Sequence, residues 1–236
     1  MSLEPTIPSK MRPLVEPPNS ISWPGMERLH AACLGLILLG IKDLILNEKD
    51  LLTPREAARF AELGPRRRRL FMAARMALKR LALQIGLARE DTPYSGIETI
   101  GSDRVRPCLD ESGLYCSVSH TNRFVVAAAH IHPVGVDIEV VSAKAMRIWH
   151  LFMPTKNADF LSTPGIRPER TATRAWTIKE AASKAFGLDL SEAIREVDIV
   201  LLGEMESAIR HRGKMYSVTH AEGETHMLSL LTCGDF

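Results

Sequence analysis

The sequence is poor in cysteine and contains no long hydrophobic run. Its four cysteines, among 236 residues, form no C-x-x-C pair, so neither a zinc knuckle nor a thioredoxin motif is expected. We expect reduced, mostly buried thiols. The longest apolar run, residues 31–41, is too short to span a bilayer. No basic region leads into an apolar stretch at the N-terminus, so we expect no signal peptide, no membrane association and a cytoplasmic protein.

An excess of charge of one sign is also missing. The chain has 30 Lys and Arg against 28 Asp and Glu, a formal net charge of +2, so no global field favours nucleic acid. The eight histidines are scattered without metal-ligand spacing. A nucleic-acid module built on the basic segment 66–80 needs aromatic residues among its cations, and Phe71 alone qualifies there. We therefore expect no nucleic-acid partner.

Proline is concentrated at the N-terminus, and the rest of the chain has an ordinary globular composition. The first 25 residues carry six prolines, at positions 5, 8, 13, 17, 18 and 24. This density disfavours regular structure and predicts an extended arm over residues 1–25. The arm is either a partly ordered tail or a functional segment. The apolar fraction of 45% is sufficient for a sizeable core in the remainder.

The segment after the arm reads as helix followed by strands. Residues 28–39 fit a buried strand or a helix, since so short a run has no decisive period. Thr53-Pro54-Arg55-Glu56 is typical of a capping box and predicts a helix to about residue 63. A second helix is predicted from Pro65 towards Gly86, with its apolar residues at three- and four-residue steps. Short β-type runs follow at 115–118, 124–129 and 134–140.

The second half repeats this order. A helix fits residues 168–186, and strands fit 197–202, 214–219 and 227–232. The class is therefore α+β, with an N-terminal half over 26–130 and a C-terminal half over 131–236. No sequence repeat occurs at a fixed period, so any structural duplication is old and degenerate.

Two carboxylates stand side by side in Gly135-Val136-Asp137-Ile138-Glu139. Residues two apart on a strand share a face, so Asp137 and Glu139 would project together. Adjacent carboxylates repel each other unless a cation lies between them, and Mg²⁺ takes one or two carboxylates plus phosphate oxygens. The alternative is a half-exposed strand with its polar face in water.

A third carboxylate occurs in the segment Trp176-Thr177-Ile178-Lys179-Glu180, which continues to Lys184 and Gly187. On a helix, Trp176, Glu180 and Lys184 share one face. Glu180 could complete a metal site, with Lys184 beside it to hold a phosphate. The alternative is an ordinary Glu–Lys helix pair.

Two further segments could bind phosphate. Ser117-Val118-Ser119-His120-Thr121 ends a strand in a small polar cluster, which is either a phosphate-binding loop or a capping turn. Arginines 66–69 begin the second helix, where positive charge opposes the helix macrodipole. That arrangement suggests a bound anion, although single-sign runs are often solvated faces.

The order and spacing of these motifs resemble the Sfp-type 4′-phosphopantetheinyl transferases. The shared elements are a Ser-His turn, G-V-D-I-E after a hairpin, and W-x-x-K-E-A-x-x-K-x-x-G further on. The stretch from Arg69 to Arg75 is loosely similar to the family's R-x-x-F-x-A-G-R, and Arg106-Pro107 to its G-K-P. The chain departs from the family at Val105, at Lys156, where many members have a glutamate, and at Asp189, where a second glycine is frequent.

The resemblance implies a fold, a metal and a site. The family's fold has two similar α+β halves about a pseudo-twofold axis, with coenzyme A in the cleft between them, and places the boundary near residues 125–135. The expected Mg²⁺ ligands are Asp137, Glu139 and Glu180, with Glu180 also the general base and Lys184 on a phosphate. The expected contacts to the nucleotide end and its 3′-phosphate are Ser119, His120, Arg106, Arg69 and Arg75.

The implied reaction is Mg²⁺-dependent transfer of 4′-phosphopantetheine from coenzyme A to a serine of an apo acyl or peptidyl carrier protein, releasing 3′,5′-ADP. The serine needs a base, and the phosphates need a metal and cations, which the chain supplies. The expected partners are coenzyme A and a carrier with an acidic docking helix, and the expected state is a monomer. The alternatives are a coenzyme A-binding relative without transfer activity and a module that only docks carrier proteins.

Overall fold

The computed structural model describes residues 21–45, 47–101, 107–109, 113–162, 165 and 167–234. The chain divides into two compact units. Unit 1 is built on Leu34–His132, and unit 2 on Ser22–Cys33 together with Pro133–Phe236. The predicted α+β class is confirmed, because each unit packs helices on an antiparallel sheet. Most of the predicted proline-rich arm, residues 1–20, lies outside the described residues.

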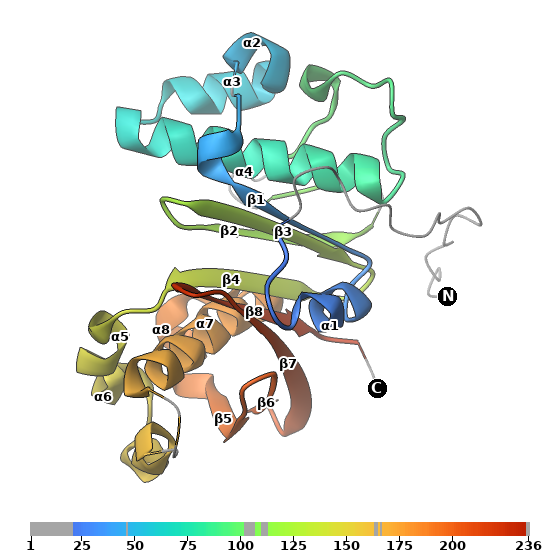
Figure 1. Ribbon diagram of the computed structural model, residues 1–236. Coiled ribbons are helices and arrows are strands. Elements are labelled where there is room, and N and C mark those ends of the chain that lie inside the picture. The colour runs from blue at the N-terminus through green and yellow to red at the C-terminus, as the bar shows by residue number, and fades with distance from the viewer. Residues whose placement is uncertain are drawn as a thin grey trace, which may run out of the picture. The chain divides into compact units, whose positions relative to one another are not determined.

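Unit 1 is a three-stranded antiparallel sheet covered by one long helix. The strands lie in the order β1 (Gly35–Gly40), β3 (Phe124–His130), β2 (Tyr115–His120). Helix α4 (Pro65–Gln84) lies along this sheet, as Figure 1 shows. Shorter elements complete the unit: η1 (Ile41–Asp43), α2 (Glu48–Leu51), α3 (Pro54–Ala61) and η2 (Tyr94–Gly96).

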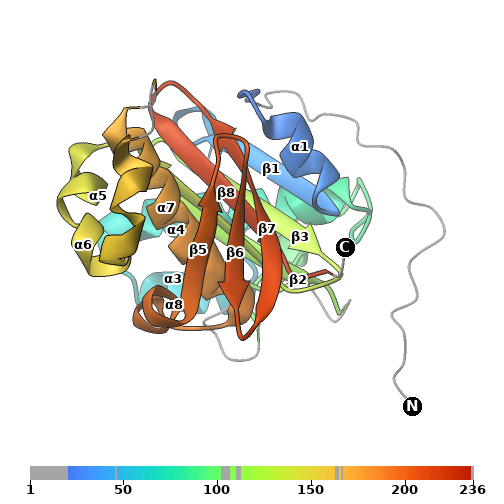
Figure 2. The same cartoon turned by 90° about the horizontal axis from the view of Figure 1, so that it is seen from below.

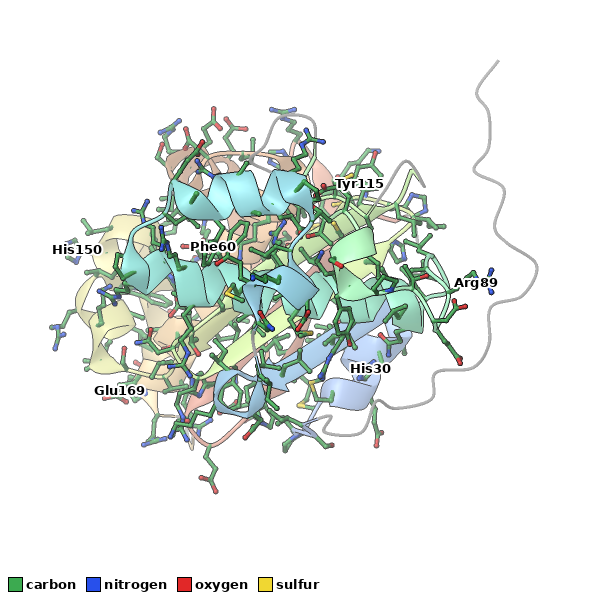
Figure 3. The ribbon with its side chains drawn as sticks, turned by 90° about the horizontal axis from the view of Figure 1, so that it is seen from above. His30, Phe60, Arg89, Tyr115, His150 and Glu169 are labelled. Atoms are coloured by element: carbon green, nitrogen blue, oxygen red, sulfur yellow. The ribbon has the colours of Figure 1, made fainter. Side chains whose placement is uncertain are left out.

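Local sequence determines where these helices begin. The predicted capping box is confirmed at Thr53, whose side chain accepts from the Glu56 N–H while the Glu56 carboxylate accepts from the Thr53 N–H. Phe60 of α3, labelled in Figure 3, lies in the core cluster of this unit together with residues of α4. The apolar stripe predicted for α4 is buried at Ala74, Leu78 and Leu81 and half-buried at its two ends, Leu70 and Ile85.

Unit 2 is a five-stranded antiparallel sheet crossed by helix α7 (Pro168–Phe186). The strands lie in the order β4 (Val134–Val140), β8 (His226–Thr232), β7 (Lys214–Glu222), β6 (Glu206–His211), β5 (Val197–Leu202), and Figure 2 shows β7, β6 and β5 side by side. The remaining elements are α1 (Met26–Ala31), α5 (Ala143–Arg147), α6 (Trp149–Phe152), η4 (Thr155–Ser162) and α8 (Leu190–Glu196).

Segment 28–39 contains both structures that its sequence allowed, since helix α1 ends at Ala31 and strand β1 begins at Gly35. Helix α1 packs against β7, so residues 22–33 group with unit 2 rather than with the N-terminal half, in which we placed residues 26–33. No helix in the described ranges is long and apolar enough to cross a membrane. No disulfide links the four cysteines, and all four are half-buried rather than mostly buried.

The two units repeat one topology. Their first strands, β1 and β4, pair antiparallel with the last strands, β3 and β8, and these pair in turn with β2 and β7. In each unit the long helix approaches the first strand at a glycine. A Cβ at Gly35 would overlap Leu81 and Ile85 of unit 1, and one at Gly135 would overlap the backbone of Ala181 and Ala185. The duplication is therefore visible in structure although no sequence repeat shows it. A twofold axis between the units stays a prediction.

Candidate functional site

The carboxylates predicted to bind a metal lie in unit 2, where β4 meets α7. Asp137 and Glu139 alternate with Val136 and Ile138 along β4, so they share the face on which Gly135 touches the helix. Asp137 is only 3% exposed, so a polar strand face in water does not describe it. Lys184 of α7 donates to Asp137 Oδ1 at 2.8 Å and to the Val136 carbonyl at 2.9 Å. The structure thus brings together Asp137 and Lys184.

Glu139 and Glu180 interact electrostatically with Asp137. Burial and then the charge of Asp137 raise the pKa of Glu139. The same two causes raise the pKa of Glu180 to about 6, with a smaller contribution from Glu139, and Lys184 opposes the shift. Three half-buried or buried carboxylates that repel one another are a donor set that a hard divalent cation fits. Lys184, joined at Glu139 by Lys144, offsets only part of their charge.

The side chains are not gathered into ligating positions. Among the described residues, no three His, Cys, Asp or Glu side chains lie close enough together to hold a metal ion. Asp137 instead accepts from the Lys184 ammonium. The metal assignment therefore rests on the chemistry of the donor set and stays a proposal.

Unit 1 has the same topology as unit 2 but has apolar residues at the positions of the two β4 carboxylates. By topology and by the glycines at the strand starts, Asp137 and Glu139 correspond to Ile37 and Leu39. Ile37 and Leu39 belong to the apolar core cluster under α4. A helix on this sheet thus needs no carboxylates at these two positions. Their presence in unit 2 points to function rather than to folding.

Other residues of the α7 motif have structural partners. The Trp176 ring packs edge-on against Phe152, and Gly187 ends the helix in the left-handed conformation at φ 67°. The Thr177 hydroxyl donates to the Arg174 carbonyl and contacts Ser229 Oγ at 2.6 Å. The motif therefore mixes residues that fold the unit with residues that carry charge into the site.

A buried histidine extends this hydroxyl chain. His220 Nδ1 lies 2.9 Å from Ser229 Oγ, and its Nε2 lies 2.7 Å from Ser207 Oγ. Burial, and to a lesser extent the charge of Arg174, lower the pKa of His220 to about 3. The imidazole is therefore neutral near pH 7 and is occupied on both sides, which assigns it to packing rather than to proton transfer.

The predicted Ser-His turn lies in unit 1, at the end of β2. Ser119 is nearly buried, and His120 is exposed. Thr121 closes the turn, since its hydroxyl accepts from the N–H groups of Arg123 and Phe124. Thr121 therefore forms the capping turn that was the alternative interpretation of this segment. His120 beside it is exposed, so phosphate binding at this turn stays a proposal.

The predicted arginines of unit 1 lie in different surroundings. Arg69 is exposed on α4, and Arg106 lies outside the described residues. Arg75 is 7% exposed and donates to the carbonyl and the hydroxyl of Thr99. Burial lowers its pKa. A substitution of Arg75 removes internal hydrogen bonds, so it cannot report cleanly on a phosphate contact.

The arginine-rich start of α4 is partly explained by its neighbour α3. Arg68 Nε donates to the Leu63 carbonyl at 2.9 Å, and its Nη2 donates to the Ala61 carbonyl at 3.2 Å. Ala61 is the last residue of α3 and Leu63 lies just beyond it, at a helix C-terminus where a cation is electrostatically favourable. One of the four charges that oppose the α4 dipole thus stabilises another helix. The role of exposed Arg66, Arg67 and Arg69 is not explained in this way.

Comparison with known proteins finds a family model within unit 2 and two curated relatives. A family model of the 4′-phosphopantetheinyl transferase superfamily matches residues 133–229. A holo-acyl-carrier-protein synthase of Geobacillus kaustophilus (strain HTA426) is 34% identical over 92 residues, which are 36% of this chain and 70% of that relative. The 4′-phosphopantetheinyl transferase gsp of Aneurinibacillus migulanus is 32% identical over 75 residues, which are 31% of this chain and 32% of that relative.

Proposed function

Because the chain belongs to the 4′-phosphopantetheinyl transferase superfamily, whose members transfer phosphopantetheine to carrier proteins, we propose that it does so with Mg²⁺ held by Asp137, Glu139 and Glu180. The substrates are coenzyme A and a serine of an apo carrier protein, and the second product is 3′,5′-ADP. The observation that carries the proposal is the carboxylate pair on β4, where the duplicated unit has isoleucine and leucine.

The chain's own groups suit this reaction. Mg²⁺ bound at the carboxylates would supply positive charge against the pyrophosphate of coenzyme A. Glu180, whose pKa is raised to about 6 by burial and by the charge of Asp137, is a base that is mostly ionised at neutral pH and still accepts a proton. It would take the proton of the carrier serine. Lys184, partly exposed beside Asp137, would hold a phosphate oxygen.

The nucleotide end of coenzyme A is assigned to unit 1. We propose that Ser119, His120, Arg69 and Arg106 bind it, with His120 and Arg69 on the 3′-phosphate. Exposure of His120 and Arg69 supports this assignment, whereas burial of Arg75 favours a supporting role for that residue. The exposed arginines of α4 also suit an acidic docking helix of the carrier. Duplication within one chain favours a monomer.

Transfer is expected only in the presence of a divalent metal. Incubation of an apo carrier protein with coenzyme A, Mg²⁺ or Mn²⁺ and this protein is expected to add one phosphopantetheine mass to the carrier. Excess chelator removes the charge that offsets the pyrophosphate, so we expect no mass gain in its presence. Intact-mass spectrometry measures both reactions. Full transfer in chelator would exclude the metal site, and no transfer under any condition would favour a coenzyme A-binding relative or a docking module.

Arg69 is expected to act on the 3′-phosphate and not on the bond that is broken. Arg69→Ala is expected to raise the KM for coenzyme A several-fold with little change in kcat, and to have almost no effect with 3′-dephospho-coenzyme A. The matched control is Arg67→Ala, which removes the same charge from the same exposed turn. Equal effects of the two substitutions, or equal effects on the two nucleotides, would assign Arg69 to a solvated helix face.

A further inference from the structure

Lys179 precedes Glu180 in the α7 motif and has no role in the chemistry proposed above. Its side chain is directed into unit 2, since the residue is only 1% exposed. The ammonium donates to the carbonyls of Ala193 at 3.5 Å and Ile194 at 3.1 Å, and also to that of Val197. Ala193 and Ile194 lie in the last turn of α8, and Val197 begins β5. Lys179 thus ties α7 to the junction of these two elements.

Unit 1 contains the same arrangement around Lys79. This lysine is also buried, and its ammonium donates to the carbonyls of Tyr94 at 2.8 Å and Ile97 at 2.6 Å. The sequence separations from the lysine are 15 and 18 residues, as they are from Lys179 to Ile194 and Val197. A lysine that links the long helix to the following segment is therefore a duplicated feature of this architecture.

The two lysines differ in their charged partners. Lys79 forms an ion pair with Glu56 at 2.6 Å, and both side chains are fully buried. In the part of the chain that the structure describes, no carboxylate lies within ion-pair distance of Lys179. Its ammonium is offset instead by carbonyl oxygens at a helix C-terminus, where a cation is favourable, and by the more distant charge of Asp198. An apolar side chain would leave these carbonyls without their donor.

The position of Lys179 relates it to the site. The sheet of unit 2 has β4 at one edge and β5 at the other, and α7 contacts both strands. Towards β5 the helix is held by Lys179, and towards β4 by the close contact at Gly135 and by the bond from Lys184 to Asp137. Two attachments on different sides of a helix fix its rotation about its own axis. Glu180 follows Lys179 directly, so its direction depends on that rotation.

We propose that Lys179 is a positioning residue, whose bonds to the α8–β5 junction hold α7 in the rotation that presents Glu180 and Lys184 to Asp137. The inference rests on the proposed function, because it concerns the same site. It predicts that loss of Lys179 changes metal binding and turnover in the folded protein. Loss of the equivalent link in unit 1 should change stability alone, since Ile37 and Leu39 replace the carboxylates there.

The test compares Lys179→Met with the matched double variant Glu56→Gln/Lys79→Met, which removes the unit 1 link without leaving a buried carboxylate unpaired. Both are expected to lower Tm. At a temperature where both are folded by circular dichroism, Lys179→Met is expected to lower kcat at least about tenfold, since a displacement of about 1 Å can cost about 100-fold. It is also expected to weaken Mn²⁺ binding, measured by electron paramagnetic resonance without coenzyme A. The double variant is expected to keep both constants near the wild-type values.

Wild-type kcat and Mn²⁺ affinity in Lys179→Met would overturn the inference, and so would equal losses in the double variant. Should Lys179→Met not fold, Lys179→Gln takes its place. Its amide still donates but its side chain is shorter, so we expect it to weaken the link and to lower the same two constants by less, and wild-type values would again overturn the inference. A wild-type protein that neither transfers phosphopantetheine nor binds Mn²⁺ would contradict the proposed function itself. That failure is distinct, because it appears before any lysine is changed.

Discussion

Glu180→Gln is expected to lower turnover on the order of 1,000-fold while coenzyme A still binds, because an amide cannot accept the serine proton. Asp137 and Glu139 keep their charges in this variant, and the substitution is nearly isosteric. The rate of mass gain on an apo carrier gives kcat, and isothermal titration with coenzyme A gives the affinity. The loss should appear in kcat far more than in the KM for coenzyme A.

Glu169→Gln is the matched control for this substitution. Glu169, labelled in Figure 3, lies in the first turn of the same helix, and its backbone carbonyl, not its side chain, accepts from Thr173. It is expected to retain wild-type turnover. A Glu180→Gln protein with wild-type kcat would remove Glu180 from the mechanism, whereas loss of coenzyme A binding would make it a ligand-binding residue rather than a base.

Replacing the site by its unit 1 counterpart is expected to abolish transfer without harming the fold. The variant Asp137→Ile/Glu139→Leu/Lys184→Gln copies Ile37, Leu39 and Gln84 of unit 1 into unit 2. Metal binding and mass gain on the carrier should fall below detection, because two of the three carboxylates are gone. Stability should stay the same or rise, since replacing buried ionic groups by apolar residues is often neutral or stabilising by about 1–4 kcal/mol.

Thermal denaturation and Mn²⁺ titration decide this case together. A large fall in Tm would show that the carboxylates and Lys184 serve the fold of unit 2, as an ordinary ion pair would. Retained transfer would place the reaction elsewhere in the chain. The expected combination, an inactive protein with an unchanged or higher Tm, separates the needs of function from those of folding at the same positions.

Local signals in the sequence were sufficient for the three longest α-helices and most strands. Helix 168–186 is α7 with the predicted bounds, and the Thr53 capping box starts α3 as expected. Strand β6 and helix α8 were not predicted. Both are short and rich in polar residues, so neither gives a clear period, and β6 is held chiefly by its pairing to β5 and β7. Pairing between distant segments has no local signal.

The site was predictable in part for a similar reason. Motif spacing indicated Asp137, Glu139, Glu180 and Lys184, and in the structure Lys184 contacts Asp137, a bond that the motif alone did not predict. The burial of Arg75 and the use of Arg68 as a cap could not be predicted, because both depend on carbonyls supplied by other segments. A basic residue on a helix looks the same in sequence whether it faces water, a phosphate or a neighbouring carbonyl. The internal role of Lys179 was missed for this reason as well.

The order of strands in unit 2 has a consequence for synthesis of the chain on the ribosome. Among the described strands, β4, which carries Asp137 and Glu139, pairs only with β8, with Asp137 opposite Ser229 and Glu139 opposite Met227. Strand β8 is translated long after β4 and after Glu180 and Lys184. Strand β4 therefore stays without its pairing partner until residues 226–232 emerge from the ribosome, because non-local pairings form late. A nascent chain stalled before β8 would contain every proposed metal ligand and still lack the strand that holds β4 in place.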